Sequence, residues 1–76
     1  MAERLPSLTR DELIRALERG GLRVVREGAN HTILWREGLS RPVPVRRHKG
    51  TMRRGHVRAI ITQAGLTVDE FIKLLG

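Results

Sequence analysis

The sequence predicts an α+β fold in which a three-stranded antiparallel sheet carries helices packed on one face. Two observations indicate it. Apolar residues recur at helical spacing near both ends of the chain, and the middle alternates apolar and polar residues between turn signals. The expected order is α-β-β-β-α with a short extra C-terminal helix. No linker or repeat interrupts the 76 residues, so we expect one domain over residues 1–76.

The first helix is predicted to follow Thr9, because Thr9 and Glu12 have the spacing of a capping box. An apolar stripe at helical spacing covers residues 13–17. Gly20 and Gly21 end the helix, since glycine tolerates the left-handed backbone of a helix terminus.

A hairpin is predicted over residues 22–35, with its turn at residues 28–30 and its second strand beginning at His31. Alternation divides this second strand between two faces, one with His31, Ile33 and Trp35 and the other with Thr32 and Leu34. The two large apolar neighbours favour burial of the His31 face. The position of His31 at the start of the strand favours exposure at the rim instead, and the sequence leaves both open.

A third strand is predicted over residues 42–47, at an edge of the sheet because Pro42 and Pro44 cannot donate hydrogen bonds. The basic segment that follows, through Gly55, is expected to be irregular. Apolar spacing then predicts a helix that Gly65 closes. A second capping box, Thr67 to Glu70, predicts the short last helix.

The positive charge is concentrated in the middle of the chain. The formal net charge is +7, and residues 23–58 hold ten basic but only two acidic residues. Thirteen of the fifteen basic residues are Arg, whose planar guanidinium suits phosphate recognition. This pattern favours a polyanionic partner, most often a nucleic acid. The alternative is an arginine-rich surface that is merely solvated.

Several classes of protein are excluded by what the sequence lacks. It has no cysteine, which removes disulfides and thiolate chemistry. Its longest apolar run is far too short to span a bilayer and no signal peptide is apparent, so we expect a cytoplasmic protein without membrane contact. No metal-ligand or phosphate-loop motif is present, so any chemistry is expected to need neither a metal nor a small-molecule cofactor.

Three histidines fall in the basic segment, and imidazole titrates near neutral pH. RNA carries its own nucleophile, the 2′-hydroxyl, so a protein has to hold the strand, move a proton and stabilise phosphoryl charge. His31, after a glycine-containing turn, is the best candidate; its alternative role is to fill a strand position. His48 is expected to contact phosphate or solvent, and His56 to be an exposed residue in the first turn of a helix.

One tryptophan and one phenylalanine are too few for a base-stacking surface. We therefore expect Trp35 to pack in the core or against the sheet, and recognition to depend mainly on arginines.

Several short motifs, in this order and at this spacing, resemble the HicA toxins of bacterial and archaeal toxin–antitoxin pairs. The resemblance covers nearly the whole chain, through Leu13–Leu17 with Gly20–Leu22, Gly28–His31, Val45–His48, Gly55–Ile60 and Gln63–Phe71. It implies a double-stranded-RNA-binding-domain-like fold and cleavage of mRNA in which His31 is essential and Gly28 forms the turn. It also implies a HicB antitoxin that covers the active surface.

From these observations we expect a toxin that is a metal-independent endoribonuclease, with His31 as general acid or base. The expected RNA-contacting residues are Gly28, Asn30, Arg46, Arg47, His48, Lys49, Arg53 and Arg54. One alternative is a non-catalytic RNA-binding module of the same fold, which recognises A-form shape without cutting. A second is a protein-binding domain whose arginines meet an acidic partner.

Overall fold

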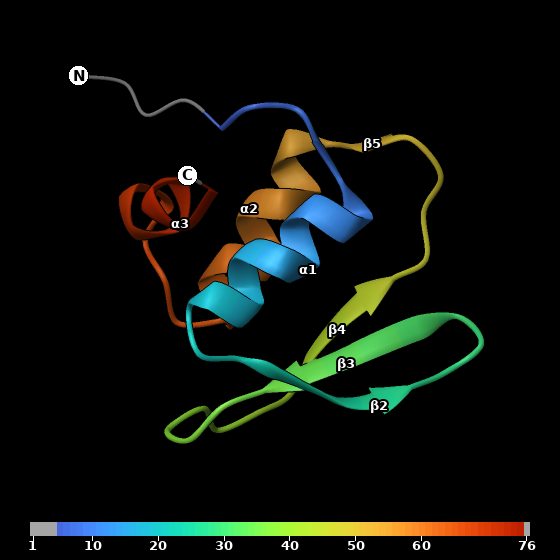
Figure 1. The fold of residues 1–76 in the computed structure, drawn as a ribbon, viewed down its shortest axis with the longest axis vertical. Helices are drawn as coiled ribbons and strands as arrows, with labels where there is room; N and C mark the ends of the chain where they lie inside the picture. Colours follow the sequence, from blue (N-terminus) through green and yellow to red (C-terminus); the bar gives the residue numbers. More distant parts are fainter. Residues whose placement is uncertain (1–4, 76) are drawn as a thin grey trace.

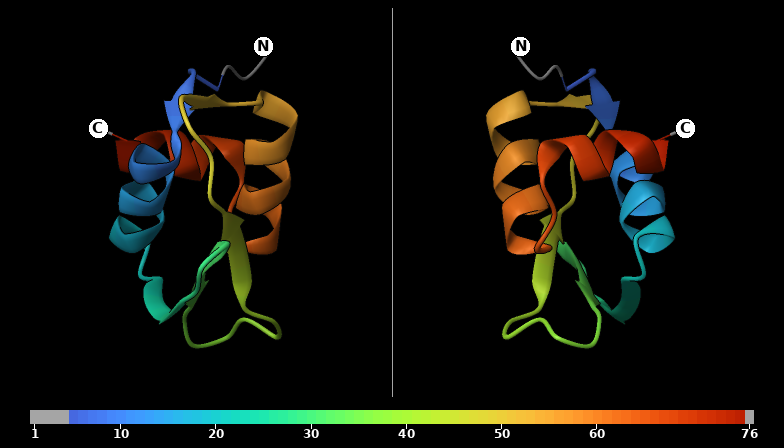
Figure 2. Two further views of the ribbon diagram at one scale, coloured as in Figure 1. Left: turned by 90° about the vertical axis from the view of Figure 1, so that its right-hand side faces the viewer. Right: turned by 90° about the vertical axis from the view of Figure 1, so that its left-hand side faces the viewer.

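The computed structural model describes residues 5–75. A three-stranded sheet forms one layer and three helices form the other, all on the same side of the sheet (Figures 1 and 2). The predicted α+β class and order are confirmed. In chain order the elements are β1 (Leu8–Thr9), α1 (Arg10–Arg19), β2 (Arg23–Glu27), β3 (His31–Trp35), β4 (Val43–Arg46), β5 (Thr51–Met52), α2 (Arg54–Gln63) and α3 (Val68–Leu75).

Both predicted capping boxes are present. The Thr9 hydroxyl accepts a hydrogen bond from the Glu12 backbone N–H at 3.2 Å, and the Glu12 carboxylate accepts from the Thr9 N–H at 2.8 Å. Thr67 and Glu70 make the same pair of bonds before α3, at 3.1 and 2.8 Å. These bonds satisfy backbone N–H groups that a helix start otherwise leaves without partners.

The sheet is antiparallel with the order β2-β3-β4, which confirms that the proline-containing strand lies at an edge. Residues Thr32 and Leu34 of β3 face Val45 and Val43 of β4. All four side chains are buried under the helices, together with Leu13, Ala16 and Leu17 of α1, Val57, Ile60 and Ile61 of α2, and Val68 and Phe71 of α3.

The face of the sheet that carries His31 is the open one. His31 is exposed, and Ile33 and Trp35 are only half-buried. Of the two alternatives that the sequence left open, exposure of His31 at the rim is the one observed, and Trp35 lies on this face of the sheet and not in the core. The reason lies in β4, where Val43 and Val45 share a face with Leu34, whereas its alternate residues on the His31 face are a proline and an arginine.

Part of the segment expected to be irregular is ordered. Thr51 and Met52 form β5, which pairs antiparallel with β1 through Leu8–Met52 and Thr9–Thr51. The helix α2 begins at Arg54, before the predicted Gly55. A two-residue strand is too short to show alternation, so only the long-range pairing reveals it. Among the described residues, no helix is long and apolar enough to cross a membrane.

The buried face can be tested with two adjacent aliphatic residues. We expect Leu34→Ala to lower the free energy of unfolding by about 2–5 kcal/mol, because Leu34 is fully buried and its truncation leaves a cavity. Ile33→Ala, on the open face, should cost clearly less. Urea denaturation of both variants measures the difference, and equal losses would contradict the assignment of the faces.

Candidate nucleic-acid interface

His31 stands at the end of a tight turn. The Gly28 N–H donates to the His31 carbonyl oxygen at 2.8 Å, which closes the β2–β3 connection. A Cβ atom at position 28 would lie 3.2 Å from that same oxygen, tighter than most such contacts. Glycine therefore lets the two backbone segments approach closely and holds His31 at the first position of a paired strand.

Arg46 lies directly across the sheet from His31. Pro44 has no N–H, so its pair with Ile33 is of the non-hydrogen-bonded kind, and the His31–Arg46 pair two residues along is of the same kind. The Cα atoms of such pairs are about 4.5 Å apart, and their side chains share one face. The imidazole and a guanidinium are thus exposed neighbours on the open face.

The turn and the end of β4 are joined by a further bond, from the Arg47 N–H to the Asn30 carbonyl oxygen at 2.9 Å. A shallow pocket of about 410 Å³ opens beside His31 on this face. We call it the His31 pocket; it is lined by Arg26, Gly28, Ala29, Asn30, His31, Ile33 and Pro44. No side-chain hydrogen bond engages the His31 ring within residues 5–75, so the ring is accessible to a ligand.

A second depression, the cationic pocket, lies between the start of α1 and the loop after β4. It is lined by Thr9, Arg10, Asp11, Arg47, His48, Lys49 and Gly50. The His48 ring is hydrogen-bonded through Nε2 to the Thr51 carbonyl oxygen at 2.9 Å, which ties it to its own loop. Three of the predicted RNA-contacting residues thus gather here, and α1 adds Arg10 to them.

The remaining predicted residues lie elsewhere. Arg53 and Arg54 are at the start of α2, beside β5 and away from the β2–β3 turn (Figure 1), and neither lines the two pockets. Nε of Arg54 donates to the Leu5 carbonyl oxygen at 2.8 Å, which gives this arginine a structural contact. His56 is exposed in the first turn of α2, as expected.

Sequence reasoning missed two arginines on the open face. Arg26 faces Ile33 and lines the His31 pocket, because the register shifts by one residue between Val24 and Arg26. The Arg23 guanidinium lies 5.3 Å from the centre of the Trp35 ring, a cation–π distance. A bulge leaves no signal in the alternation pattern, so the sequence could not have placed Arg26.

A polar cluster around the buried Thr32 hydroxyl supports the turn from the other face of the sheet. The Thr32 hydroxyl, 1% exposed, donates to a Glu27 carboxylate oxygen at 2.6 Å and accepts a hydrogen bond from the Arg10 guanidinium. Arg10 and Glu27 also form an ion pair, with an N–O distance of 3.5 Å. This cluster ties α1, β2 and β3 together at Thr32, the residue that follows His31 in β3.

The fold and this interface define the class of protein. It is a small α+β protein in which cationic side chains and an accessible imidazole lie around one end of the sheet. A protein-family model described as HicA toxin of bacterial toxin–antitoxin matches residues 10–66, which include the whole three-stranded sheet, the His31 pocket and the cationic pocket apart from Thr9. The chain therefore belongs to the HicA toxin family and is the toxin of a toxin–antitoxin pair, with an antitoxin as its partner. No curated protein and no solved structure matches it significantly.

The polar cluster around Thr32 generates a stability prediction. Thr32→Val removes the hydroxyl that links Arg10 to Glu27 and should lower the free energy of unfolding by about 1–3 kcal/mol, because two part-buried hydrogen bonds to charged groups are lost. Thr62→Val is the matched control, since the exposed Thr62 bonds only its own helix; we expect a change within about 0.5 kcal/mol. Similar losses in the two variants, measured by thermal or urea unfolding, would argue against the cluster.

Proposed function

We propose that residues 1–76 form a single HicA-like domain that acts in the cytoplasm as a metal-independent endoribonuclease on mRNA, with His31 as its general acid or base. The observation that carries the proposal is the exposed His31 imidazole beside Arg46 on the open face of the sheet. A turn closed by Gly28 supports that imidazole, and the cationic pocket lies around the same end of the sheet.

The reaction follows from the chemistry of RNA. The 2′-oxygen attacks the adjacent phosphorus, the new bond from 2′-oxygen to phosphorus forms and the bond to the 5′-oxygen breaks. The products are a 2′,3′-cyclic phosphate and a 5′-hydroxyl. Neutral His31 removes the 2′-hydroxyl proton, or protonated His31 delivers a proton to the leaving 5′-oxygen. One imidazole begins in only one of these states, so the other proton transfer falls to water or to His48. Alternatively, the 5′-oxygen leaves as an alkoxide that Arg46 stabilises, and water then protonates it.

Cations hold the strand and stabilise the phosphoryl oxygens. Arg46 is next to His31 across the sheet, so we assign it to the scissile phosphate. The cationic pocket, with Arg47, His48 and Lys49, is suited to a neighbouring phosphate. Gly28 and Asn30 shape the turn against which the RNA lies. Arg53 and Arg54, at the start of α2, are assigned to phosphates farther along the RNA. A HicB-like antitoxin, rich in acidic residues, would neutralise the toxin by covering these cations.

We expect His31→Ala to reduce cleavage of single-stranded RNA by about 10²- to 10⁴-fold, the usual contribution of a positioned acid or base. His56→Ala is the matched control because His56 is exposed on α2, outside both pockets, and should leave the rate unchanged. The assay is gel separation of end-labelled RNA in excess EDTA, with detection of cyclic phosphate ends.

Full activity of a folded His31→Ala variant would contradict the proposed role of the imidazole. Loss of activity in EDTA would contradict the metal-independent mechanism. If wild-type protein leaves RNA uncleaved and retards only duplex RNA in a gel, the non-catalytic RNA-binding module is favoured instead.

Phosphate contacts by Arg46 and Arg47 can be tested through salt. For single-stranded RNA, the logarithm of the binding constant falls with the logarithm of salt concentration by about 0.7 per neutralised phosphate. We expect Arg46→Gln and Arg47→Gln each to make this slope shallower by about that amount, in a His31→Gln background that prevents cleavage. Arg58→Gln, an exposed change on α2 outside the pockets, should leave the slope as it is, and an identical slope in all variants would contradict the assignment.

A further inference from the structure

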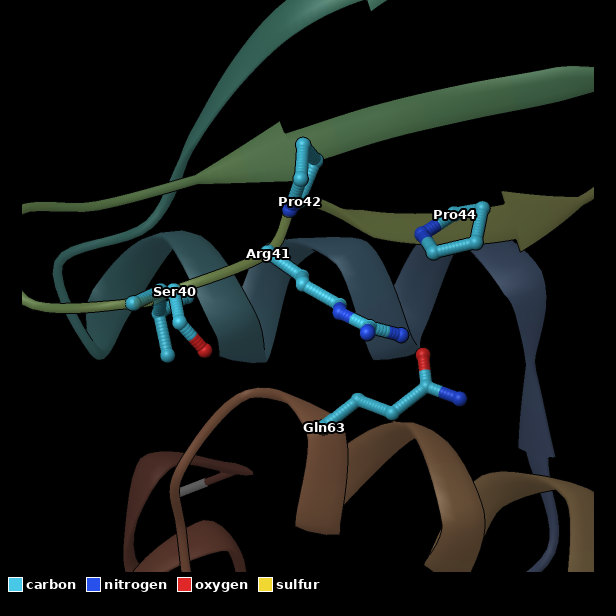
Figure 3. A pocket seen from close by; sticks show the side chains of 6 residues that line it. Ser40, Arg41, Pro42, Pro44 and Gln63 are labelled. Carbon is cyan, nitrogen blue, oxygen red and sulfur yellow. The ribbon is translucent and has the colours of Figure 1, made fainter.

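A third pocket lies beyond the edge of the sheet, between β4 and the last turn of α2 (Figure 3). We call it the proline pocket; its volume is about 460 Å³, and it is lined by Leu39, Ser40, Arg41, Pro42, Pro44 and Gln63. Its size is in the range of small-molecule sites, roughly 300–1,000 Å³. The proposed nuclease mechanism uses none of its polar residues.

Two polar side chains reach into this pocket from opposite walls. Figure 3 shows the Arg41 guanidinium, from the segment before β4, and the Gln63 amide, from α2, pointing toward one another. Neither side chain has a hydrogen bond or an ion pair to another residue within the described range 5–75. Both side chains are exposed, so the pair is available to a ligand that satisfies both.

The β4 side of the pocket is formed by two prolines and cannot accept another strand. Pro42 and Pro44 present rings in place of N–H groups along this edge of β4. A β-strand added here would find carbonyl groups but no donors at those positions. The edge is therefore unsuited to strand pairing and better suited to a flat ring resting against the two prolines.

The proline pocket borders the His31 pocket at Pro44. Pro44 lines both, and it faces Ile33, the next residue after His31 on the same side of β3. Neighbouring positions on one face of a sheet are about 7 Å apart, which is close to the spacing of successive nucleotides in an extended strand. In an RNA strand with its cleaved link at His31, an adjacent nucleotide therefore lies at Pro44, the wall that the proline pocket shares.

We propose that the proline pocket binds a guanine base next to the cleaved link and so gives this toxin a sequence preference. The inference rests on the proposed nuclease function. A guanidinium pairs in bidentate fashion with guanine O6 and N7, both acceptors. The same edge of adenine carries an amino donor that would oppose Arg41, and pyrimidines lack N7. The Gln63 amide oxygen can accept from guanine N1–H or the 2-amino group, and unpaired RNA bases expose these edges.

A carboxylate from an acidic protein would also meet Arg41, but it fits the pocket less well. A carboxylate only accepts hydrogen bonds, so it could accept from the guanidinium and the amide NH2 group but would leave the amide oxygen without a donor. It would also gain nothing from two proline rings. A base uses the guanidinium, the amide and the apolar wall together.

The test is cleavage of a random single-stranded RNA pool, with the cut sites read by sequencing. We expect wild-type protein to enrich guanine at one fixed position beside the cut by at least about fivefold, the lower end for a bidentate contact. Arg41→Ala and Gln63→Ala should remove most of this enrichment while cleaving guanine-free RNA within about twofold of the wild-type rate. Arg58→Ala, which removes an α2 cation outside the pocket, should retain the enrichment.

Cleavage without any base preference, or a guanine preference that survives in Arg41→Ala, would overturn the inference while leaving the nuclease function standing. Loss of the nuclease function is recognised separately, by His31-independent cleavage or none. In that event, the proline pocket is tested by binding alone, with fluorescence anisotropy of short oligonucleotides that differ in one base. Tighter binding of the guanine oligonucleotide that disappears in Arg41→Ala supports the pocket, and equal binding of all four, or an Arg41-dependent affinity for acidic peptide alone, overturns it.

Discussion

The register between β3 and β4 is the constraint on which the rest of the structure depends. It places Val43 and Val45 on the same face of the sheet as Leu34, and this face packs against the helices. A shift by one residue would bury Arg46 and expose both valines, at a large cost in desolvated charge and lost apolar burial. The same pairing leaves His31 and Arg46 adjacent in solvent. Core formation and the arrangement of the interface therefore follow from one set of contacts.

The candidate interface is supported by contacts on the opposite face of the sheet. The cluster of Arg10, Thr32 and Glu27 links α1 to both strands of the hairpin and lies under the turn that carries His31. An exposed imidazole on a hairpin end is ordinarily a mobile group, but this hairpin end is tied to a helix. The ion pair with Arg10 also offsets the charge of Glu27, one of the two acidic residues of the basic segment.

The His31 pocket and the proline pocket share Pro44 as a lining residue. This proline has three effects. It blocks strand addition at the edge, determines which β3–β4 pairs lack hydrogen bonds, and separates the His31 pocket from the proline pocket. For a toxin of a toxin–antitoxin pair, an antitoxin that covers this region would block both pockets at once.

The sequence by itself determined the local features. Thr9 and Thr67 cap helices through bonds to residues three positions away, Pro42 and Pro44 exclude a central strand, and the turn before His31 follows from residue type. Only the tertiary structure decided which face of β3 is open, that a bulge brings Arg26 to His31, and that Arg10 and Gln63 border the sites. Alternation with period two separates two faces but does not say which one meets the helices, because that choice depends on contacts between residues distant in the chain.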